Sequence, residues 1–351
     1  MGAEACADNE REGIDAVKTV VITGCAGLLG SHFSRHLINK GYKVVGIDNL
    51  SGGYADYLPK AEMEKFEFWP IDLSDTCTSK SLDHIFSNND VVACYHFAAY
   101  AAEGLSPFIR MFNYENNILA SVNIINACIK HDVKMVFTSS MAVYGNQTPP
   151  FKESMRQAPM DPYGIAKYAI EMDLEVAKEQ HELRYSIVRP HNIIGIYQNI
   201  WDRYRNVAGI FIRKVLDGEP MLIYGDGEQT RAFSDVKYYM EPFEQLINDH
   251  DGELFNLGAD KAYSINDLAD TVKAIALKNG YEAVKKHVEP RHEVKYAHCD
   301  HAKAKSLLGF SDNTNLEGLI DEMFNWALTQ PKREQKIMDY EVTKGIYEYW
   351  K

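Results

Sequence analysis

The sequence predicts an α/β fold in which a doubly wound parallel sheet carries a smaller mixed α/β domain. Short runs rich in β-branched residues alternate with helical stretches up to about Arg189. The expected strands are Thr19–Ile22, Lys43–Ile47, Phe66–Trp69, Val91–Tyr95, Met135–Phe137 and Tyr185–Val188. These runs are almost continuously apolar, which is typical of parallel strands covered by helices on both faces. Right-handed crossovers then give a doubly wound sheet.

Helical stretches such as Leu29–Lys40 and Asn117–Lys130 lie between these strands. After about Arg189 the alternation gives way to loops rich in Gly, Pro, Asp and Arg. Within that half, Glu253–Gly258 can return one strand to the main sheet, and Ser264–Lys278 is expected to form a surface helix with Ser264 as its N-cap.

Composition excludes several classes of function. The formal net charge of −13 argues against binding nucleic acid or an anionic membrane through bulk charge. The six cysteines show no paired or metal-like spacing, so we expect a reduced, cytoplasmic protein with no metal site. No apolar run reaches the length of a membrane span.

A glycine-rich turn follows the first expected strand and opens a helix. Its pattern is Gly24-x-x-Gly27-x-x-Gly30. Glycines at these places allow a tight turn and a close approach of the backbone to a pyrophosphate at the helix N-terminus. The second strand ends at Asp48, whose carboxylate can accept the hydroxyls of an adenosine ribose and repel a 2′-phosphate. The pattern therefore predicts a dinucleotide site that prefers NAD to NADP.

Tyr163 and Lys167 lie four residues apart, downstream of Ser139 and Ser140. Residues at this spacing share one face of a helix. A nearby ammonium favours a phenolate, so we expect the pKa of Tyr163 to fall toward the working pH. A tyrosine in that state can take a proton from a sugar or alcohol hydroxyl.

Taken together, these motifs resemble those of the extended short-chain dehydrogenase/reductase family. Besides those above, the motifs that carry the resemblance are Asp48-Asn49-Leu50, Asp72-Leu73, His96-Phe97-Ala98-Ala99, Thr138–Gly145, Arg189–Gly195 and Gly225–Arg231. Within the family, the chain is most similar to the nucleotide-sugar 4-epimerases, the group of UDP-galactose 4-epimerase. The likeness extends over roughly residues 18 to 330.

The resemblance implies a role for each matching residue. Tyr163 would be the base, and Lys167 would support it and hold the nicotinamide ribose. Ser140, with Ser139 beside it, would contact the sugar O4. The implied cofactor-binding residues are Gly24, Gly27, Leu28, Leu29, Gly30, Asp48, Asn49, Asp72, Leu73, Ala98, Ala99, Asn117, Lys167 and Pro190. The implied substrate-binding residues are Ser140, Tyr163, Asn192, Arg231, Arg291 and Ala297.

The composition along the chain and the resemblance together predict a division of the chain. We expect residues 1–16 to be a disordered acidic tail and residues 17–190 to be an NAD-binding Rossmann domain, with a return segment near 230–260. Residues 191–345 would form the substrate-binding domain. Two helices, from Asn117 to Lys130 and from Ile165 to Ala177, are those that family members pair in a homodimer, although simple packing on the sheet would explain their apolar faces equally well.

The residues around the expected site reduce the number of candidate reactions and substrates. Met141 and Ala142 follow Ser140, so the acid–base pair that a dehydratase of this family uses is missing. The small Ala297 is expected to leave room for an N-acetyl group beside the sugar. Glu103 either reaches the pocket or is a solvated loop carboxylate, and Arg291 is either a substrate ligand or a surface charge.

The sequence thus predicts an NAD-dependent 4-epimerase that acts on a UDP-hexose, with UDP-N-acetylhexosamines also admitted. Two related alternatives stay open, an NAD(P)H-dependent 4-keto-sugar reductase and a UDP-uronate 4-epimerase. A non-catalytic dinucleotide-binding regulator is a more remote alternative, because such a protein would not need both Tyr163 and Lys167.

Overall fold

The computed structural model describes residues 17–60 and 63–351; the tail expected at residues 1–16 lies outside this range. Its centre is a parallel sheet of seven strands in the order β11-β6-β5-β4-β1-β2-β3. The strands are β1 Thr19–Thr23, β2 Lys43–Ile47, β3 Phe66–Trp69, β4 Val91–His96, β5 Lys134–Thr138, β6 Tyr185–Pro190 and β11 Leu254–Leu257. The predicted doubly wound sheet is confirmed, and the expected return strand pairs with β6.

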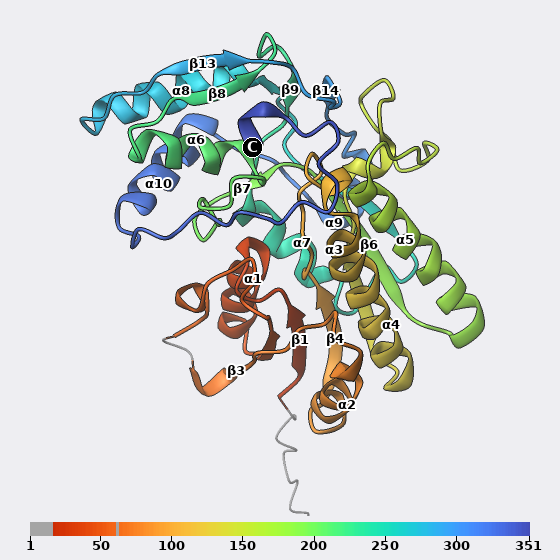
Figure 1. The fold of residues 1–351 in the computed structure, drawn as a ribbon. Helices are drawn as coiled ribbons and strands as arrows, with labels where there is room; N and C mark the ends of the chain where they lie inside the picture. Colours follow the sequence, from red (N-terminus) through yellow and green to blue (C-terminus); the bar gives the residue numbers. More distant parts are fainter. Residues whose placement is uncertain (1–16, 61–62) are drawn as a thin grey trace, which may run out of the picture.

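Helices cover both faces of this sheet (Figure 1). On one face, α1 Leu28–Asn39 and α7 Met240–Gln245 pack their apolar sides on the strands, and α9 Ala302–Leu308 joins the same core. On the other face lie α2 Ser79–Ser87, α4 Ala120–Lys130 and α5 Pro162–His181. Apolar strand residues such as Val20 and Val21 point to opposite faces and are fully buried in different cores. This explains the continuous apolar runs in the sequence.

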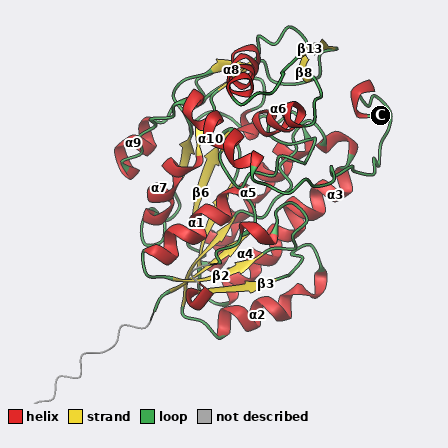
Figure 2. Ribbon diagram, turned by 90° about the vertical axis from the view of Figure 1, so that its left-hand side faces the viewer, coloured by secondary structure: helices red, strands yellow, loops and turns green. Residues whose placement is uncertain are grey.

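A smaller layer sits beyond the carboxyl ends of the strands, at the top of Figure 2. Its helices are α6 Val207–Leu216, α8 Ile265–Lys278 and α10 Leu316–Leu328, which share a core of their own. Short strands complete it: β8 Met221–Tyr224 with β13 Lys285–Val288, β9 Thr230–Arg231 between β12 Tyr263–Ser264 and β14 Tyr296–Ala297, and β7 Ile193–Ile194 with β10 Ser234–Asp235. Helix α8 begins at a capping box of Ser264 and Asp267, as the N-cap prediction required.

Two features differ from the predicted elements. The helix expected from Asn117 begins earlier, because α3 Arg110–Tyr114 and a π-helical turn, Glu115–Leu119, run directly into α4. The C-terminal segment after α10 has only a short 3₁₀ helix, Glu348–Trp350, yet it crosses back over the molecule toward α3 (dark blue in Figure 1). The Glu341 carboxylate accepts hydrogen bonds from the first amides of α3, and Trp350 is buried against Phe108 and Tyr204. Within the described ranges, no helix is long and apolar enough to span a membrane.

Candidate active site

A cavity of about 1000 Å³ lies between the sheet and the smaller layer. Its walls come from the turn after β1, the ends of β4, β5 and β6, the start of α5, the smaller layer and the C-terminal segment. Ligands of open parallel sheets bind at this edge, beyond the carboxyl ends of the strands. The cavity therefore joins the predicted dinucleotide and substrate sites in one continuous space.

The glycine turn forms one end of the cavity, and two of its glycines cannot be replaced without a clash. Gly24 has φ +69°, and a Cβ there would lie 2.7 Å from the backbone nitrogen of Ala98. A Cβ on Gly30 would lie 2.1 Å from the carbonyl oxygen of Gly24. Gly27, which caps α1 without a side-chain bond, lines the cavity together with Leu28 and Leu29. The first amides of α1 are thus available to a phosphate.

Acidic and amide groups at the ends of β2 and β3 lie beside this turn. The Asp48 carboxylate accepts hydrogen bonds from the amides of Ala26 (3.0 Å) and Leu50 (2.7 Å). Burial raises the pKa of Asp48, and these two bonds act in the opposite direction. Asn49 donates to Asp72 across 3.0 Å, and both line the cavity with Leu73. The structure therefore brings together all the residues predicted for the adenosine end.

The end of β4 supplies a narrow wall made by Ala98 and Ala99, which both line the cavity. Asn117 was expected to contact the cofactor, but it does not line the cavity. Its side chain instead accepts from the amide of Tyr100 (3.1 Å) and donates to the carbonyl of Tyr100 (3.2 Å). The prediction for Asn117 is therefore wrong as a direct contact, because the side chain is used to hold the loop after β4.

The residues predicted to be catalytic gather where β5 meets the start of α5. Ser140, Tyr163 and Lys167 line the cavity, and Pro190 lies nearby at the end of β6. The Lys167 ammonium donates to the carbonyl of Thr138 (2.8 Å) and lies 5.9 Å from the centre of the Tyr163 ring. Tyr and Lys therefore share one face of α5, as their spacing predicted.

The Ser139 hydroxyl does not point to a reacting group. It donates to the Glu171 carboxylate, which also receives the guanidinium of Arg189 in a buried ion pair. Ser139 lines part of the cavity, but its hydroxyl proton is used in this buried hydrogen bond. The expectation that Ser139 shares the proton transfer is therefore not supported by its position, and Ser140 is the serine that faces the site.

Burial governs the protonation of the catalytic pair. It raises the pKa of Tyr163 well above the usual range, although a hydrogen bond with Ser140 acts in the lowering direction. Burial also lowers the pKa of Lys167 to about 7, and Glu171 partly opposes this. The predicted fall in the pKa of Tyr163 is therefore wrong for the protein without a bound cofactor. The physical reason is that burial disfavours both the Tyr163 phenolate and the Lys167 ammonium. In addition, the ammonium donates its hydrogen bond to the carbonyl of Thr138 and not to the phenol.

At the opposite end of the cavity, two arginines meet one carboxylate. Arg231 and Arg291 each lie 3.0 Å from Oε2 of Glu293. The Arg291 guanidinium also lies over the Tyr224 ring, 4.7 Å from its centre. Both guanidiniums line the cavity and suit phosphate oxygens. The sequence identified the two arginines but not Glu293, which holds them in place.

Several buried polar atoms along the cavity lack partners among the described residues. They are Thr138 Oγ1, Asn192 Nδ2, Gln198 Oε1, Arg213 Nε and Nη2, and Arg291 Nε. Leaving such a group unsatisfied costs about 1–3 kcal/mol. A ligand rich in oxygen and nitrogen would satisfy these atoms. Together with the glycine turn, they fit a dinucleotide at one end and a nucleotide diphosphate at the other.

Ala297 does not lie where its predicted role requires. It is buried in a cluster with Val143, Tyr144 and Phe151, and it does not line the cavity. Strand β14 pairs with β9 in a register that sets Ala297 beside Arg231. The position therefore gives no support to the prediction that this residue sets the room for an N-acetyl group.

Two parts of the wall were missed by the sequence analysis. Arg203 and Arg205 come from the loop before α6, and Tyr347, Tyr349 and Trp350 come from the C-terminal segment. The Tyr349 ring stacks on Tyr224 at 4.5 Å between ring centres, and its carbonyl accepts a hydrogen bond from Arg203. The only available signal was composition, because the loop before α6 is rich in arginine and tyrosine and the C-terminal segment is rich in tyrosine.

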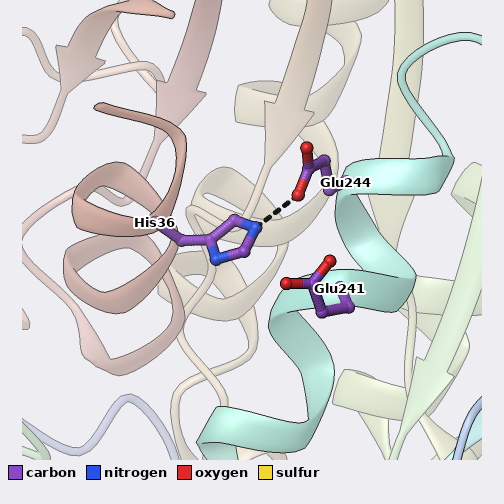
Figure 3. Close-up of side chains that lie close together, drawn as sticks. All are labelled: His36, Glu241 and Glu244. Atoms are coloured by element: carbon purple, nitrogen blue, oxygen red, sulfur yellow. Dashed lines mark hydrogen bonds and ion pairs between the residues drawn. The ribbon is translucent and has the colours of Figure 1, made fainter. Parts of the chain in front are cut away.

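A group of three side chains on the surface has the spacing of a metal site, but its carboxylates are already paired with a lysine. His36 Nε2 lies 2.6 Å from Glu244, and Glu241 lies beside them (Figure 3). The Lys40 ammonium is 3.3 Å from Glu241 and 3.2 Å from Glu244. We interpret the group as an ion-pair network that joins α1 to α7.

Known proteins share both the sequence and this fold. The family model described as "NAD dependent epimerase/dehydratase family" matches residues 20–258. The UDP-glucose 4-epimerase of Caenorhabditis elegans is 30% identical over 345 residues, with 89% of this chain and 98% of that protein covered. The solved UDP-glucose 4-epimerase of Thermotoga maritima, with UDP-glucose, has a TM-score of 0.81 at 30% identity and covers 88% of this chain and 98% of its own. The UDP-N-acetylglucosamine 4-epimerase of Methanobrevibacter ruminantium, in complex with UDP-N-acetylmuramic acid, also has a TM-score of 0.81 at 30% identity, with 90% and 100% covered.

Proposed function

Because the chain belongs to the NAD dependent epimerase/dehydratase family, we propose that it inverts C4 of a UDP-hexose through a transient 4-keto sugar. The observation that carries this proposal is that Tyr163 and Ser140 line the same cavity as the glycine turn and the arginine pair. The predicted family, fold class, enzyme class and NAD cofactor are confirmed by the comparisons.

The cofactor end would hold NAD mainly through the backbone. The amides at the start of α1 would bind the pyrophosphate, and Asp48 would accept a ribose hydroxyl. NAD, when bound, supplies a nicotinamide that accepts a hydride from C4 and returns it to the opposite face of the sugar. Lys167, one turn from Tyr163 and close to the end of β5, would hold the nicotinamide ribose.

Tyr163 would act as the base that removes the O4 proton, and Ser140 would hold O4 within reach. The raised pKa of Tyr163 means that the phenolate needs added positive charge before it forms readily. An oxidised nicotinamide carries such a charge, and Lys167 adds a second when protonated. On reduction, the same phenol returns its proton to O4.

The substrate end would anchor the diphosphate rather than the sugar. Arg231, Arg291 and the unsatisfied amide of Asn192 would bind its oxygens. Because the diphosphate is bound strongly and lies far from C4, the 4-keto sugar can rotate in the site without leaving the protein. The ring can then present its other face to the same hydride donor.

Incubation of the purified protein with UDP-galactose, without added cofactor, tests this proposal. We expect UDP-glucose to accumulate to equilibrium, identified by NMR, and NAD to be released on denaturation. A requirement for stoichiometric NAD(P)H would indicate the alternative 4-keto-sugar reductase. Binding of NAD with no turnover of any UDP-sugar would indicate a dinucleotide-binding regulator.

We also propose that the chain forms a homodimer through α5 and the neighbouring α3–α4 segment. Ile165, Met172 and Val176 are 44%, 46% and 54% exposed, and their spacing puts them on one face of α5. Light scattering after gel filtration should give twice the chain mass, and Met172→Glu with Val176→Glu should give the monomer. The expectation of a cytoplasmic protein remains a prediction; all five cysteines in the described ranges are free thiols.

A further inference from the structure

Two carboxylates that the proposed reaction does not use lie next to Tyr163. Glu103 belongs to the loop after β4, and Asp161 is the N-cap of α5. Both line the cavity. The Ser106 hydroxyl lies between them, 2.8 Å from the carbonyl oxygen of Glu103 and 3.3 Å from Oδ1 of Asp161. The two acidic residues are therefore held by one local network.

The two carboxylates are held differently. Asp161 accepts a hydrogen bond from the amide of Gly164 (3.0 Å), so part of its role is to cap α5. Glu103, by contrast, is an exposed residue that lines the cavity, and its side chain has no ion pair or hydrogen bond with any residue in the described ranges. The two nearby guanidiniums, those of Arg231 and Arg291, form ion pairs with Glu293 instead. A carboxylate placed in this way has its acceptor oxygens available to a ligand.

The neighbours of Glu103 in the chain place it beside the sugar. The next residue is Gly104, and a Cβ there would lie 3.4 Å from the guanidinium of Arg291, at the diphosphate end. The Ser106 hydroxyl, which bonds to the Glu103 carbonyl, also accepts a hydrogen bond from the amide of Tyr163 (3.2 Å). A sugar with its O4 at Tyr163 and its diphosphate at the arginines would therefore pass Glu103. A carboxylate on that sugar would face the side chains of Glu103 and Asp161, and like charges repel.

We infer that Glu103 and Asp161 determine the substrate class of this site: they accept hydrogen bonds from the hydroxyls of an uncharged hexose and reject a sugar that carries a carboxylate. The inference rests on the proposed function, and it selects the UDP-hexose reaction over the UDP-uronate 4-epimerase alternative. Selection between sugars thus depends on the charge of Glu103 and Asp161 and not on Ala297, which lies outside the cavity.

The test measures kcat/KM of the wild-type enzyme for UDP-glucose and for UDP-glucuronate, and repeats it with Glu103→Gln. Glutamine keeps the shape of the side chain and removes its charge. We expect the wild type to prefer UDP-glucose at least 100-fold and Glu103→Gln to reduce this preference at least tenfold. Asp161→Asn, which retains a good helix N-cap, should change the preference in the same direction by a smaller factor. Glu282→Gln, an exposed site outside the cavity, is the control and should change nothing.

Binding measurements separate failure of this inference from failure of the proposed function. If the wild type epimerises neither sugar, the proposed function is wrong, and calorimetric dissociation constants for the two UDP-sugars still test the charge selection. Equal use of both sugars by the wild type would overturn the inference and leave the 4-epimerase in place. An unchanged preference in Glu103→Gln, with an unchanged melting temperature, would also overturn it.

Discussion

The two ends of the cavity are built by different means. The cofactor end is built around one glycine turn, whose backbone shape is fixed by Gly24 and Gly30, with short polar groups at the ends of the neighbouring strands beside it. The substrate end is formed by side chains from β9, the loop after β13 and the C-terminal segment, and they are held by shared ion pairs and ring stacking. The difference teaches that a site made of backbone can be read from local spacing, whereas a site made of distant side chains cannot.

The largest expected effect is at Tyr163, where the two ends meet. Tyr163→Phe removes the proton acceptor, so we expect kcat to fall by about 10²–10⁴-fold, the usual contribution of a general base. The NAD content, measured after denaturation, should stay near that of the wild type. Tyr168→Phe, on the same helix, is the matched control and should retain activity. Near-normal turnover by Tyr163→Phe would rule out the assignment.

The cofactor end is tested by Gly24→Ala. The added Cβ would lie 2.7 Å from a backbone atom at a residue with φ +69°, so the turn must shift. Strained residues of this kind cost about 1–3 kcal/mol, and we expect the purified protein to lose most of its bound NAD. Gly280→Ala has a similar positive φ but meets no atom within 4 Å, so it isolates backbone strain from the clash. Full NAD content in Gly24→Ala would contradict the backbone description of this end.

The substrate end is tested by Arg231→Ala. A hydrogen bond to a charged group contributes about 1.5–3 kcal/mol, so kcat/KM for the UDP-sugar should fall roughly 10–100-fold, mostly through KM. NAD content should not change, because Arg231 belongs to the other end. Arg184→Ala, an exposed residue, serves as the control. A loss of NAD together with substrate binding would show that the two ends are not independent.

The smallest effect concerns the pH dependence of stability at Lys167. Its folded-state pKa is about 7 and its usual value is 10.5, so the folded protein binds fewer protons than the unfolded chain between these pH values. The penalty for burying the ammonium is therefore full below pH 7 and is relieved as pH rises toward 10.5. Lys167→Met removes this penalty. Denaturant unfolding should therefore show a free energy of unfolding that exceeds the wild-type value by more at pH 6 than at pH 9. The excess should shrink by up to about 1.4 kcal/mol for each pH unit above 7. Exposed Lys273→Met should show no such dependence, and a pH-independent difference for Lys167→Met would contradict the assigned shift.

The sequence by itself determined the sheet, the glycine turn, Asp48, and the pairing of Tyr163 with Lys167 on one helix face. The glycine turn and the Tyr163–Lys167 pair depend on residues that are near in the chain, so their spacing carries the geometry, and each strand of the sheet is a short apolar run that is visible locally. Only the tertiary structure decided that Ser139 bonds to Glu171, that Asn117 holds a loop, that Ala297 lies in a core, and that Glu103 and the C-terminal aromatics reach the cavity. The direction of the Tyr163 pKa was also decided there, because desolvation depends on everything packed around a group and not on its neighbours in sequence.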